Sequence, residues 1–241
     1  SGTSGNRFKA RASIMALTLL YRGRTVGPIC RFIAAQGPGM TALLDHSIPD
    51  QLPGTIVRWG SRWDGHATRE INSAAAVRLV RNKGLTRQVL GDLSPPTWFF
   101  VRDITEWPCV IRPRRHYGGA RFMVCDDRRS ALRAKRACGR GYYASPLIQR
   151  THEYRVFVLH GRVIGVSERY LLDTLGEEQQ RTAWNLHAGG HTRRIKRGSW
   201  QMPVVLTAIH ALRRVGVDFG AVDLAVRPDG STVGFEINTA P

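Results

Sequence analysis

Hydrophobic and polar residues follow two kinds of spacing along the chain, and together they predict a mixture of strands and helices. Short apolar runs bounded by glycine, proline or charged residues are typical of strands. They occupy residues 15–21, 55–59, 97–103, 108–113, 122–124 and 146–149, and two longer hairpins over 153–170 and 221–238. Apolar residues that recur every three or four positions predict helices over 72–90, 126–139 and 200–215.

Short polar residues and glycines predict where some of these elements begin and end. Asn72 or Ser73 can cap the first helix, because a short polar side chain satisfies free N–H groups of the first turn. Gly84 interrupts the apolar pattern of that helix, which then resumes and ends at Gly91. The run Ser94-Pro95-Pro96 that follows predicts a boundary between two lobes.

The composition excludes several classes of protein. Of the 241 residues, 42% are hydrophobic and six are tryptophan, which supplies a core and excludes a disordered basic tail. No apolar run approaches the roughly 18 residues that span a bilayer, and the first residues lack a signal-peptide pattern. Four widely spaced cysteines without zinc-ligand spacing favour a reducing compartment. We therefore expect a cytoplasmic protein without a membrane partner.

The charge is strongly positive, with 36 Lys and Arg against 18 Asp and Glu and a formal net charge of +18. Such a charge favours an anionic partner, whether nucleic acid, nucleotide phosphate, an acidic substrate or an anionic surface. Only four of the basic residues are lysine, so a GC-rich genome that favours arginine is an alternative cause. Charge alone therefore names no function.

The last hairpin gathers acidic and amide side chains on one face. A two-residue turn at Asp229-Gly230 places Asp223 opposite Glu236 and Asn238 opposite Ala221. Two opposed carboxylates repel each other, and a bound cation would remove the conflict. Oxygen ligands of this kind suit Mg²⁺; the alternative is a solvated acidic edge whose register differs by one residue. The other face would pack in the core, with Val222, Leu224, Val226, Val233, Phe235 and Ile237.

The order of several motifs along the chain resembles that of the ATP-grasp superfamily. They run from RWG, INSAAAV and PPTWF through VIRPRRHYGGARFMV and EYRVFVLHGRVIG to WNLHAGG, VDLAV and GFEIN. Within the superfamily, the chain is most similar to carboxylate–amine ligases of the glutathione-synthetase and ribosomal-protein glutamate-ligase type, including small phage-encoded members. The similarity covers residues 55–241, and the final hairpin and WNLHAGG are its most specific parts.

The resemblance implies an α/β fold with α+β subdomains that hold ATP between their sheets. We expect a flexible arm or tag remnant over residues 1–14, with Met15 as an alternative start, and a short N-terminal α/β lobe over 15–93. A small ATP-grasp subdomain with a glycine loop would span 94–150, and a C-terminal ATP-grasp subdomain with the metal hairpin would span 151–241. Related chains continue past the equivalent of Pro241, so a truncated end or a missing terminal helix is expected.

The resemblance also implies residues for metal and nucleotide. Asp223, Glu236 and Asn238 would hold one or two Mg²⁺ ions, or Mn²⁺, against the phosphates of ATP. The nucleotide would contact a larger set, namely Lys83, Arg112, the glycine loop Tyr117, Gly118, Gly119 and Ala120, the adenine segment Leu147, Ile148 and Gln149, and Glu153 at the ribose. Arg112 stands where the family has lysine, and its planar head needs different room. An ordinary hairpin turn and a surface lysine are the alternatives for the loop and for Lys83.

Three residues are candidates for catalysis. Arg155 matches a family position near the phosphates, although an exposed ion pair with Glu153 on the same strand face is the alternative. WNLHAGG resembles the family segment R-x-N-x-x-x-G-G and supplies Asn185, but the family arginine falls on Ala183. Arg181, two residues before Ala183, and Arg155 are therefore the two possible replacements.

These assignments imply an ATP-dependent ligase that joins a carboxylate and an amine through an acyl phosphate. Two basic clusters lie outside the ATP motifs, over residues 128–140 and 193–197. The second follows the Asn185 loop and would steer an acidic peptide or protein, or an amine carried by nucleic acid; a solvated charged face is the alternative. Two other functions stay open, a nucleic-acid-binding protein with a non-catalytic ATP-grasp shell and an ATP-grasp phosphotransferase.

Overall fold

The computed structural model describes residues 16–22, 26–45, 48–116, 121–139, 141–172, 181, 183–184 and 190–241. The expected arm over 1–14 lies outside these ranges, as do Tyr117, Gly118, Gly119 and Ala120 of the glycine loop, and Asn185. No helix among the described residues is long and apolar enough to cross a membrane.

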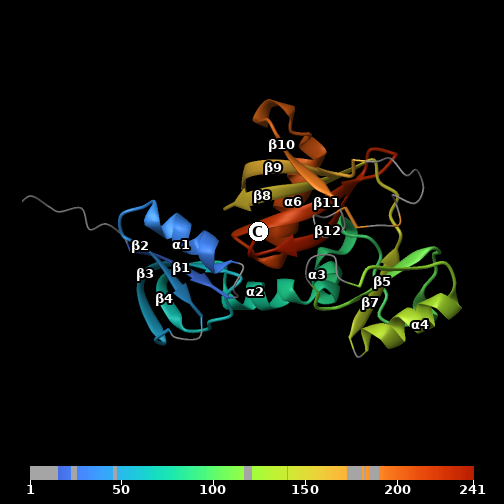
Figure 1. Cartoon of the computed structure of the whole chain (residues 1–241), viewed down its shortest axis with the longest axis horizontal. Helices are drawn as coiled ribbons and strands as arrows, with labels where there is room; N and C mark the ends of the chain where they lie inside the picture. The colour runs from blue at the N-terminus through green and yellow to red at the C-terminus, as the bar shows by residue number, and fades with distance from the viewer. Residues whose placement is uncertain are drawn as a thin grey trace, which may run out of the picture.

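The N-terminal lobe is a parallel four-stranded sheet with the order β2-β1-β3-β4 (blue to cyan in Figure 1). Its strands are β1 (Leu17–Tyr21), β2 (Met40–Leu44), β3 (Gln51–Trp59) and β4 (His66–Ile71), and the helix α1 (Gly27–Ala35) packs against it. The predicted strands over 15–21 and 55–59 are confirmed by β1 and β3. The sequence patterns did not predict α1, β2 or β4.

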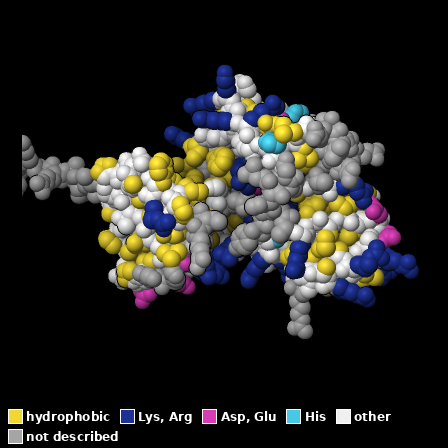
Figure 2. Space-filling model, in the orientation of Figure 1, with side chains coloured by type: hydrophobic (Ala, Val, Ile, Leu, Met, Phe, Trp, Pro, Cys, Tyr) yellow, Lys and Arg dark blue, Asp and Glu magenta, His cyan; other side chains and the backbone are white. Residues whose placement is uncertain are grey.

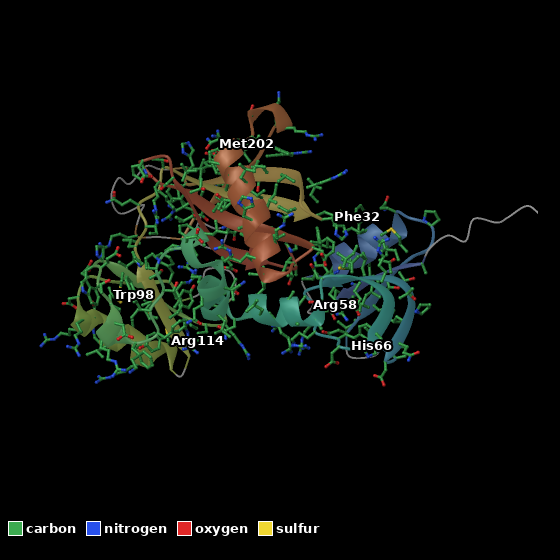
Figure 3. The ribbon with its side chains drawn as sticks, turned by 180° about the vertical axis from the view of Figure 1, so that it is seen from behind. Phe32, Arg58, His66, Trp98, Arg114 and Met202 are labelled. Carbon is green, nitrogen blue, oxygen red and sulfur yellow. The ribbon has the colours of Figure 1, made fainter. Side chains whose placement is uncertain are left out.

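A small sheet with the order β6-β5-β7 forms the second part. It comprises β5 (Cys109–Pro113), β6 (Met123–Cys125) and β7 (Tyr142–Pro146), and α4 (Arg128–Cys138) packs on it through buried alanines. Asp127 caps α4 in a reciprocal arrangement with Ser130. Figure 3 shows Trp98 and Arg114 in this part of the molecule.

Two predicted strands of the second part are wrong. Residues 97–103 form a single bridge from Trp98 to Ala144 and a 3₁₀ turn, η2 (Val101–Asp103), although Val101 still enters the core. Residues 147–149 of the strand expected over 146–149 are not part of a strand. The observed strand, β7, ends at Pro146, and its residues pair with β5. An apolar run shows that a segment is buried but not that it pairs with a neighbouring strand.

The third part is an antiparallel five-stranded sheet with the order β10-β9-β8-β11-β12. Its strands are β8 (His152–Leu159), β9 (Arg162–Tyr170), β10 (His191–Ile195), β11 (Phe219–Val226) and β12 (Thr232–Asn238). The turn between β8 and β9 lies at His160-Gly161 as predicted, with positive φ at both residues. The helix α6 (Met202–Val215), which ends at Gly216 as expected, crosses one face of the sheet (Figure 3), and a 3₁₀ turn, η4 (Arg197–Ser199), precedes it.

Two short helices, α2 (Ala74–Arg81) and α3 (Lys83–Leu90), replace the single interrupted helix that the pattern suggested. Ser73 caps α2 and Asn82 caps α3, and the 3₁₀ turn η1 (Gly91–Leu93) follows. Both helices pack on the core of the five-stranded sheet with α6, although they precede the expected boundary at residue 93. Figure 1 shows these two helices beneath that sheet, between the N-terminal lobe and the small sheet of the second part.

Asn72 joins the N-terminal lobe to the last sheet. Its amide nitrogen donates to the carbonyl of Phe219 at 2.7 Å, and its amide oxygen accepts from the backbone N–H groups of Asp218 and Phe219, each at 2.9 Å. The side chain is buried and its φ is 67°. Ser73 caps the helix, and Asn72 fixes the lobes together.

Candidate active site

A cavity of about 640 Å³ lies between the small sheet and the face of the five-stranded sheet that α6 leaves uncovered. Strands β5 and β7 and the segment after β7 form one wall, and β8, β9, β11 and β12 form the other. The charged and amide side chains that line it are Arg87, Arg112, Arg150, Glu153, Arg155, Arg169, Asp223, Glu236 and Asn238.

The last hairpin pairs its acidic residues as the sequence predicts, but its turn is one residue longer than expected. Asp223 lies opposite Glu236, and Ala221 lies opposite Asn238. The turn, however, spans residues 228–230: Arg227 and Ser231 still form a backbone hydrogen bond of 2.8 Å, and Gly230 takes a φ of 82°. A bulge in β12 at Phe235, where the pairing shifts, compensates for the extra turn residue.

The bulge also changes the face that Phe235 occupies. The sequence placed this residue in the core with the other apolar residues of the hairpin, yet it is half-buried and lines the cavity. A bulge redirects side chains because two residues of one strand oppose a single residue of the other. That expectation for Phe235 is therefore wrong.

Asp223 is held by two arginines. Arg155 donates to both of its carboxylate oxygens, and Arg169 donates to one of them from Nη2 at 3.0 Å. Arg169 also reaches Glu153, with Nη1 2.8 Å from Oε1. Arg155 therefore pairs with Asp223 across the strands and not with Glu153 on its own strand, as the alternative to its catalytic role supposed.

Glu153 is buried between two cations. Arg169 contacts one of its carboxylate oxygens, and Nε of Arg150 lies 3.2 Å from the other. Burial raises the pKa of Glu153, and the two arginines act against this rise. For Arg169, burial acts to lower the pKa, but Asp223 and Glu153 outweigh it and raise it. The two arginines thus stabilise the charged form of buried Glu153, and removal of either would leave its charge less well compensated.

Glu236 is held by a different cation, Lys83. The Lys83 Nζ lies 3.0 Å from Oε1 of Glu236 and donates to the carbonyl of Ile237 at 2.8 Å. Burial acts to raise the pKa of Glu236, but Lys83, His116 and Arg112 outweigh it and lower the pKa to about 2. Lys83 is only 6% exposed, so the alternative of a surface lysine is wrong.

Asn238 completes the acidic group. With its amide turned to satisfy both neighbours, its nitrogen donates to Oε1 of Glu236 at 2.9 Å and its oxygen accepts from Nη2 of Arg155 at 3.3 Å. The structure thus brings the three predicted metal ligands together on the cavity wall beside Arg155, and Lys83 pairs with one of them, Glu236.

Arg112 faces this group from β5. Its Nη2 lies 3.0 Å from Nδ1 of His116, and Nε2 of His116 lies 3.3 Å from the hydroxyl of Tyr143. Burial and the charge of Arg112 lower the pKa of His116 to about 3. A neutral His116 can therefore accept a hydrogen bond from Arg112 and hold its guanidinium in place.

Two buried nitrogens at the cavity lack a partner among the described residues, Nε of Arg112 and Nη1 of Arg87. Arg87 also donates from Nε to the carbonyl of Phe235 and stacks on Tyr143, and its burial lowers its pKa. Unsatisfied buried donors are costly, and an anionic oxygen in the cavity would satisfy them.

The remaining predicted residues are placed as follows. Leu147 and Ile148 line both this cavity and a neighbouring one of about 760 Å³, whereas Gln149 lines only the neighbouring one. Ala183 lines the central cavity beside Trp184, on whose ring Arg150 stacks at 4.4 Å. Arg181 is not brought to the cavity: its guanidinium contacts Asp126 at 2.6 Å on the surface.

Three arginines of the site, Arg87, Arg150 and Arg169, were not predicted from the sequence. A hairpin that turns at residues 160–161 without irregularity would oppose Glu153 to Glu168. A bulge in β9 at Ile164 shifts the pairing, so that Glu153 opposes Arg169 instead. Arg87 reaches the cavity only because α3 packs on β12. Neither event leaves a local signal in the sequence.

The donor set fits a hydrated divalent cation together with phosphate groups. Asp223, Glu236 and Asn238 offer oxygen ligands only, which is what Mg²⁺ prefers. The hydrogen bonds from Arg155 and Arg169 leave part of the oxygen lone-pair capacity of Asp223 free. The unpartnered donors of Arg87 and Arg112 lie on the same cavity and suit phosphate oxygens.

The fold is that of the ATP-grasp ligases, as expected from the sequence motifs. The chain is similar to D-alanine–D-alanine ligase from Bacillus anthracis, with a TM-score of 0.67 and 10% identity over 94% of this chain and 87% of that one. It is similar to the ATP-grasp ligase PsnB in complex with a phosphomimetic variant of its minimal precursor, Mg and ADP (TM-score 0.65, 14% identity, 94% and 90% covered).

A third similar structure is the macrocyclase MdnC bound to the precursor peptide MdnA from Microcystis aeruginosa MRC. Its TM-score is 0.59 at 12% identity, with 94% of this chain and 92% of that chain covered. The sequence matches no family model and no curated protein. At these identities, the similarity establishes the ATP-grasp fold.

Proposed function

We propose that this protein is an ATP-dependent carboxylate–amine ligase. The observation that carries the proposal is the pairing, in one cavity of an ATP-grasp fold, of the Asp223–Glu236–Asn238 oxygen group with the unpartnered donors of Arg87 and Arg112. The first group suits a divalent cation, and the second suits the phosphates that such a cation accompanies.

Mg²⁺ would be held by Asp223, Glu236 and Asn238, and Mn²⁺ would suit the same ligands. When bound, the metal supplies positive charge that neutralises the phosphate oxygens during transfer. Arg112 and Arg87 would bind phosphate oxygens, and Leu147 and Ile148 would contact the base at the cavity wall. The sequence-based roles of the glycine loop and Asn185, which lie outside the described residues, remain part of this proposal.

The reaction would proceed in two steps. A substrate carboxylate oxygen attacks the γ-phosphorus of ATP, which forms an acyl phosphate and releases ADP. An amine then attacks the acyl carbon, inorganic phosphate leaves, and a proton is lost as the amide forms. Arg155 lies next to Asp223 in the cavity and would stabilise the charge on the transferring oxygens, which is an electrostatic contribution that needs no nucleophilic side chain.

The acceptor is proposed to be a peptide or another acidic molecule. The net charge of +18 favours a negatively charged partner. PsnB, in complex with a variant of its minimal precursor, and MdnC, bound to a precursor peptide, have the same fold as this chain. A peptide substrate is therefore the first class to test.

The test is a thermal-shift titration with ATP and Mg²⁺, followed by a phosphate-release screen over paired carboxylates and amines. The proposal expects a shift that requires the metal and that is lost in Glu236→Ala, with phosphate released only when both substrates are present. Asp64→Ala, which removes an exposed carboxylate of the N-terminal lobe, is the control and should shift as the wild type does. No shift with nucleotide and metal would contradict the proposal.

The same screen distinguishes the two other functions. A phosphotransferase would yield ADP and a phosphorylated product without an amide. A nucleic-acid-binding protein with a non-catalytic shell would bind DNA or RNA with a steep salt dependence and would not turn over ATP.

A further inference from the structure

A row of polar residues crosses all five strands of the large sheet on its cavity side. Strand pairing joins Glu236 to Asp223, Asp223 to Arg155, Arg155 to Ser167, and Ser167 to Arg194. Directly opposed residues of antiparallel strands point to the same face. The first four line the cavity, so Arg194 on the edge strand β10 extends the same row beyond it.

Arg193 and Arg194 are neighbours in sequence but lie on opposite faces of the sheet. Arg193 contacts the buried carboxylate of Glu168, with Nη2 2.6 Å from Oε2, and stacks on Tyr170. These contacts attach β10 to β9 on the side away from the cavity. Thr192 lines the cavity, which agrees with the alternation that places Arg194 on that side.

Arg194 is exposed and has no hydrogen-bond or ion-pair partner in the part of the chain that the structure describes. The other cation of the row, Arg155, is paired with Asp223, and Lys83 on α3 pairs with Glu236 at the inner end of the row. Basic side chains gather over β10 and β9 at the top of Figure 2. The outer end of the row thus presents a guanidinium free to bind an anion.

We propose that Ser167 and Arg194 form a docking subsite for a second anionic group on the carboxylate substrate. Arg155 and Arg194 are separated by two strand spacings, about 10 Å. In an extended peptide, side chains two residues apart point to the same face and are about 7 Å apart, and two flexible Glu side chains can spread to cover the remaining few ångströms. The substrate class is therefore an acidic peptide in which a second carboxylate lies near the reacting one. This inference rests on the proposed function, because that function places the reacting carboxylate beside Arg155.

The experiment measures fluorescence anisotropy of two labelled peptides, Glu-Ala-Glu and Glu-Ala-Gln, with capped ends so that they differ by one carboxylate. The wild-type protein is expected to bind the first peptide about fivefold more tightly, the effect of one exposed ion pair. Arg194→Gln should remove this preference and leave the affinity for the second peptide unchanged. Ser167→Ala should reduce the preference in the same direction.

Arg213→Gln is the matched control, because Arg213 is exposed on α6 at the opposite face of the sheet. It should keep the full preference. A preference that is absent in the wild type, that survives in Arg194→Gln, or that falls equally in Arg213→Gln overturns the subsite. Arg193 is unsuitable as a control, because its removal would leave Glu168 without a close ion-pair partner.

Thermal shifts with ATP and Mg²⁺ on the same variants report on the proposed function separately. Nucleotide binding without peptide preference overturns the subsite alone. A preference that depends on Arg194, in a protein that binds no nucleotide, supports the anionic subsite and overturns the ligase.

Discussion

Arg155 on β8 donates from Nε and Nη2 to the two carboxylate oxygens of Asp223 on β11, at 2.7 and 2.9 Å. The sequence suggested that a bound cation relieves the repulsion between Asp223 and Glu236. In the structure the chain itself supplies the opposing charges, with Arg155 and Arg169 at Asp223 and Lys83 at Glu236. These ion pairs offset the repulsion between the two carboxylates on one face of the sheet, where both offer oxygen ligands to the proposed divalent metal.

Arg169→Met should destabilise the protein by about 3 kcal/mol, because it takes a shared cation from two buried carboxylates, Glu153 and Asp223. Urea unfolding followed by tryptophan fluorescence measures the loss. Arg162→Met, at an exposed position of the same strand, should change the unfolding free energy by no more than about 0.5 kcal/mol. Equal losses in the two variants would show that the buried network contributes no particular stability.

Glu236 should make stability depend on acidity. Its pKa is lowered from 4.5 to about 2 because Lys83, His116 and Arg112 outweigh the effect of burial. A carboxyl with a lowered folded-state pKa contributes stability above its unfolded value and loses it as the pH falls through the folded value. The unfolding free energy of the wild type should therefore fall more steeply between pH 4.5 and about 2 than that of Glu236→Gln. Parallel curves from urea melts at several pH values would contradict the assignment.

His116 should position Arg112 as a neutral hydrogen-bond acceptor. His116→Ala is expected to weaken ATP binding about tenfold through loss of a hydrogen bond to a charged group, whereas His116→Asn restores an acceptor and should recover part of it. His210→Ala, on the exposed side of α6, is the control. Because the pKa of His116 is about 3, its titration should not alter ATP affinity near neutral pH. A change near pH 6.5 that disappears in His116→Ala would contradict this role.

Gly230→Ala should cost about 1–2 kcal/mol, since an L side chain is strained at its φ of 82°. Gly198→Ala is a close control: a Cβ would meet nothing within 4 Å at either position, and only Gly230 has a positive φ. Thermal unfolding of the two variants compares the backbone effect directly. Equal melting temperatures would indicate that the turn adopts another conformation.

Strand alternation allowed much of the site to be predicted. It placed Asp223, Glu236 and Asn238 on one face, and Glu153 and Arg155 together on another strand, and all five line the cavity. The turn at His160-Gly161 and the end of α6 at Gly216 were also readable, because glycine tolerates the backbone conformations that these positions need. These features depend on residues close together in the chain.

Other features were misread because their causes lie elsewhere. The three-residue turn and the Phe235 bulge cancel, so the correct pairing of Asp223 with Glu236 came from a wrong turn length. The Ile164 bulge substitutes Arg169 for Glu168 opposite Glu153. A bulge shifts the register of every residue pair beyond it, and the sequence of these strands contains no pattern that predicts its position.

The sequence by itself determined the ATP-grasp order of motifs, the faces of the final hairpin and the residue types that suit metal and phosphate. Only the tertiary structure decided which cation neutralises which carboxylate. Lys83 reaches Glu236, and Arg87 reaches the cavity, because α3 packs against β12 some 150 residues later in the chain. Arg193 and Arg194 are adjacent residues of the same type, and strand alternation places them on opposite faces of the sheet. Because β10 lies at the sheet edge beside β9, Arg193 pairs with Glu168. Local pattern sets the direction of a side chain, whereas its partners depend on packing between distant segments.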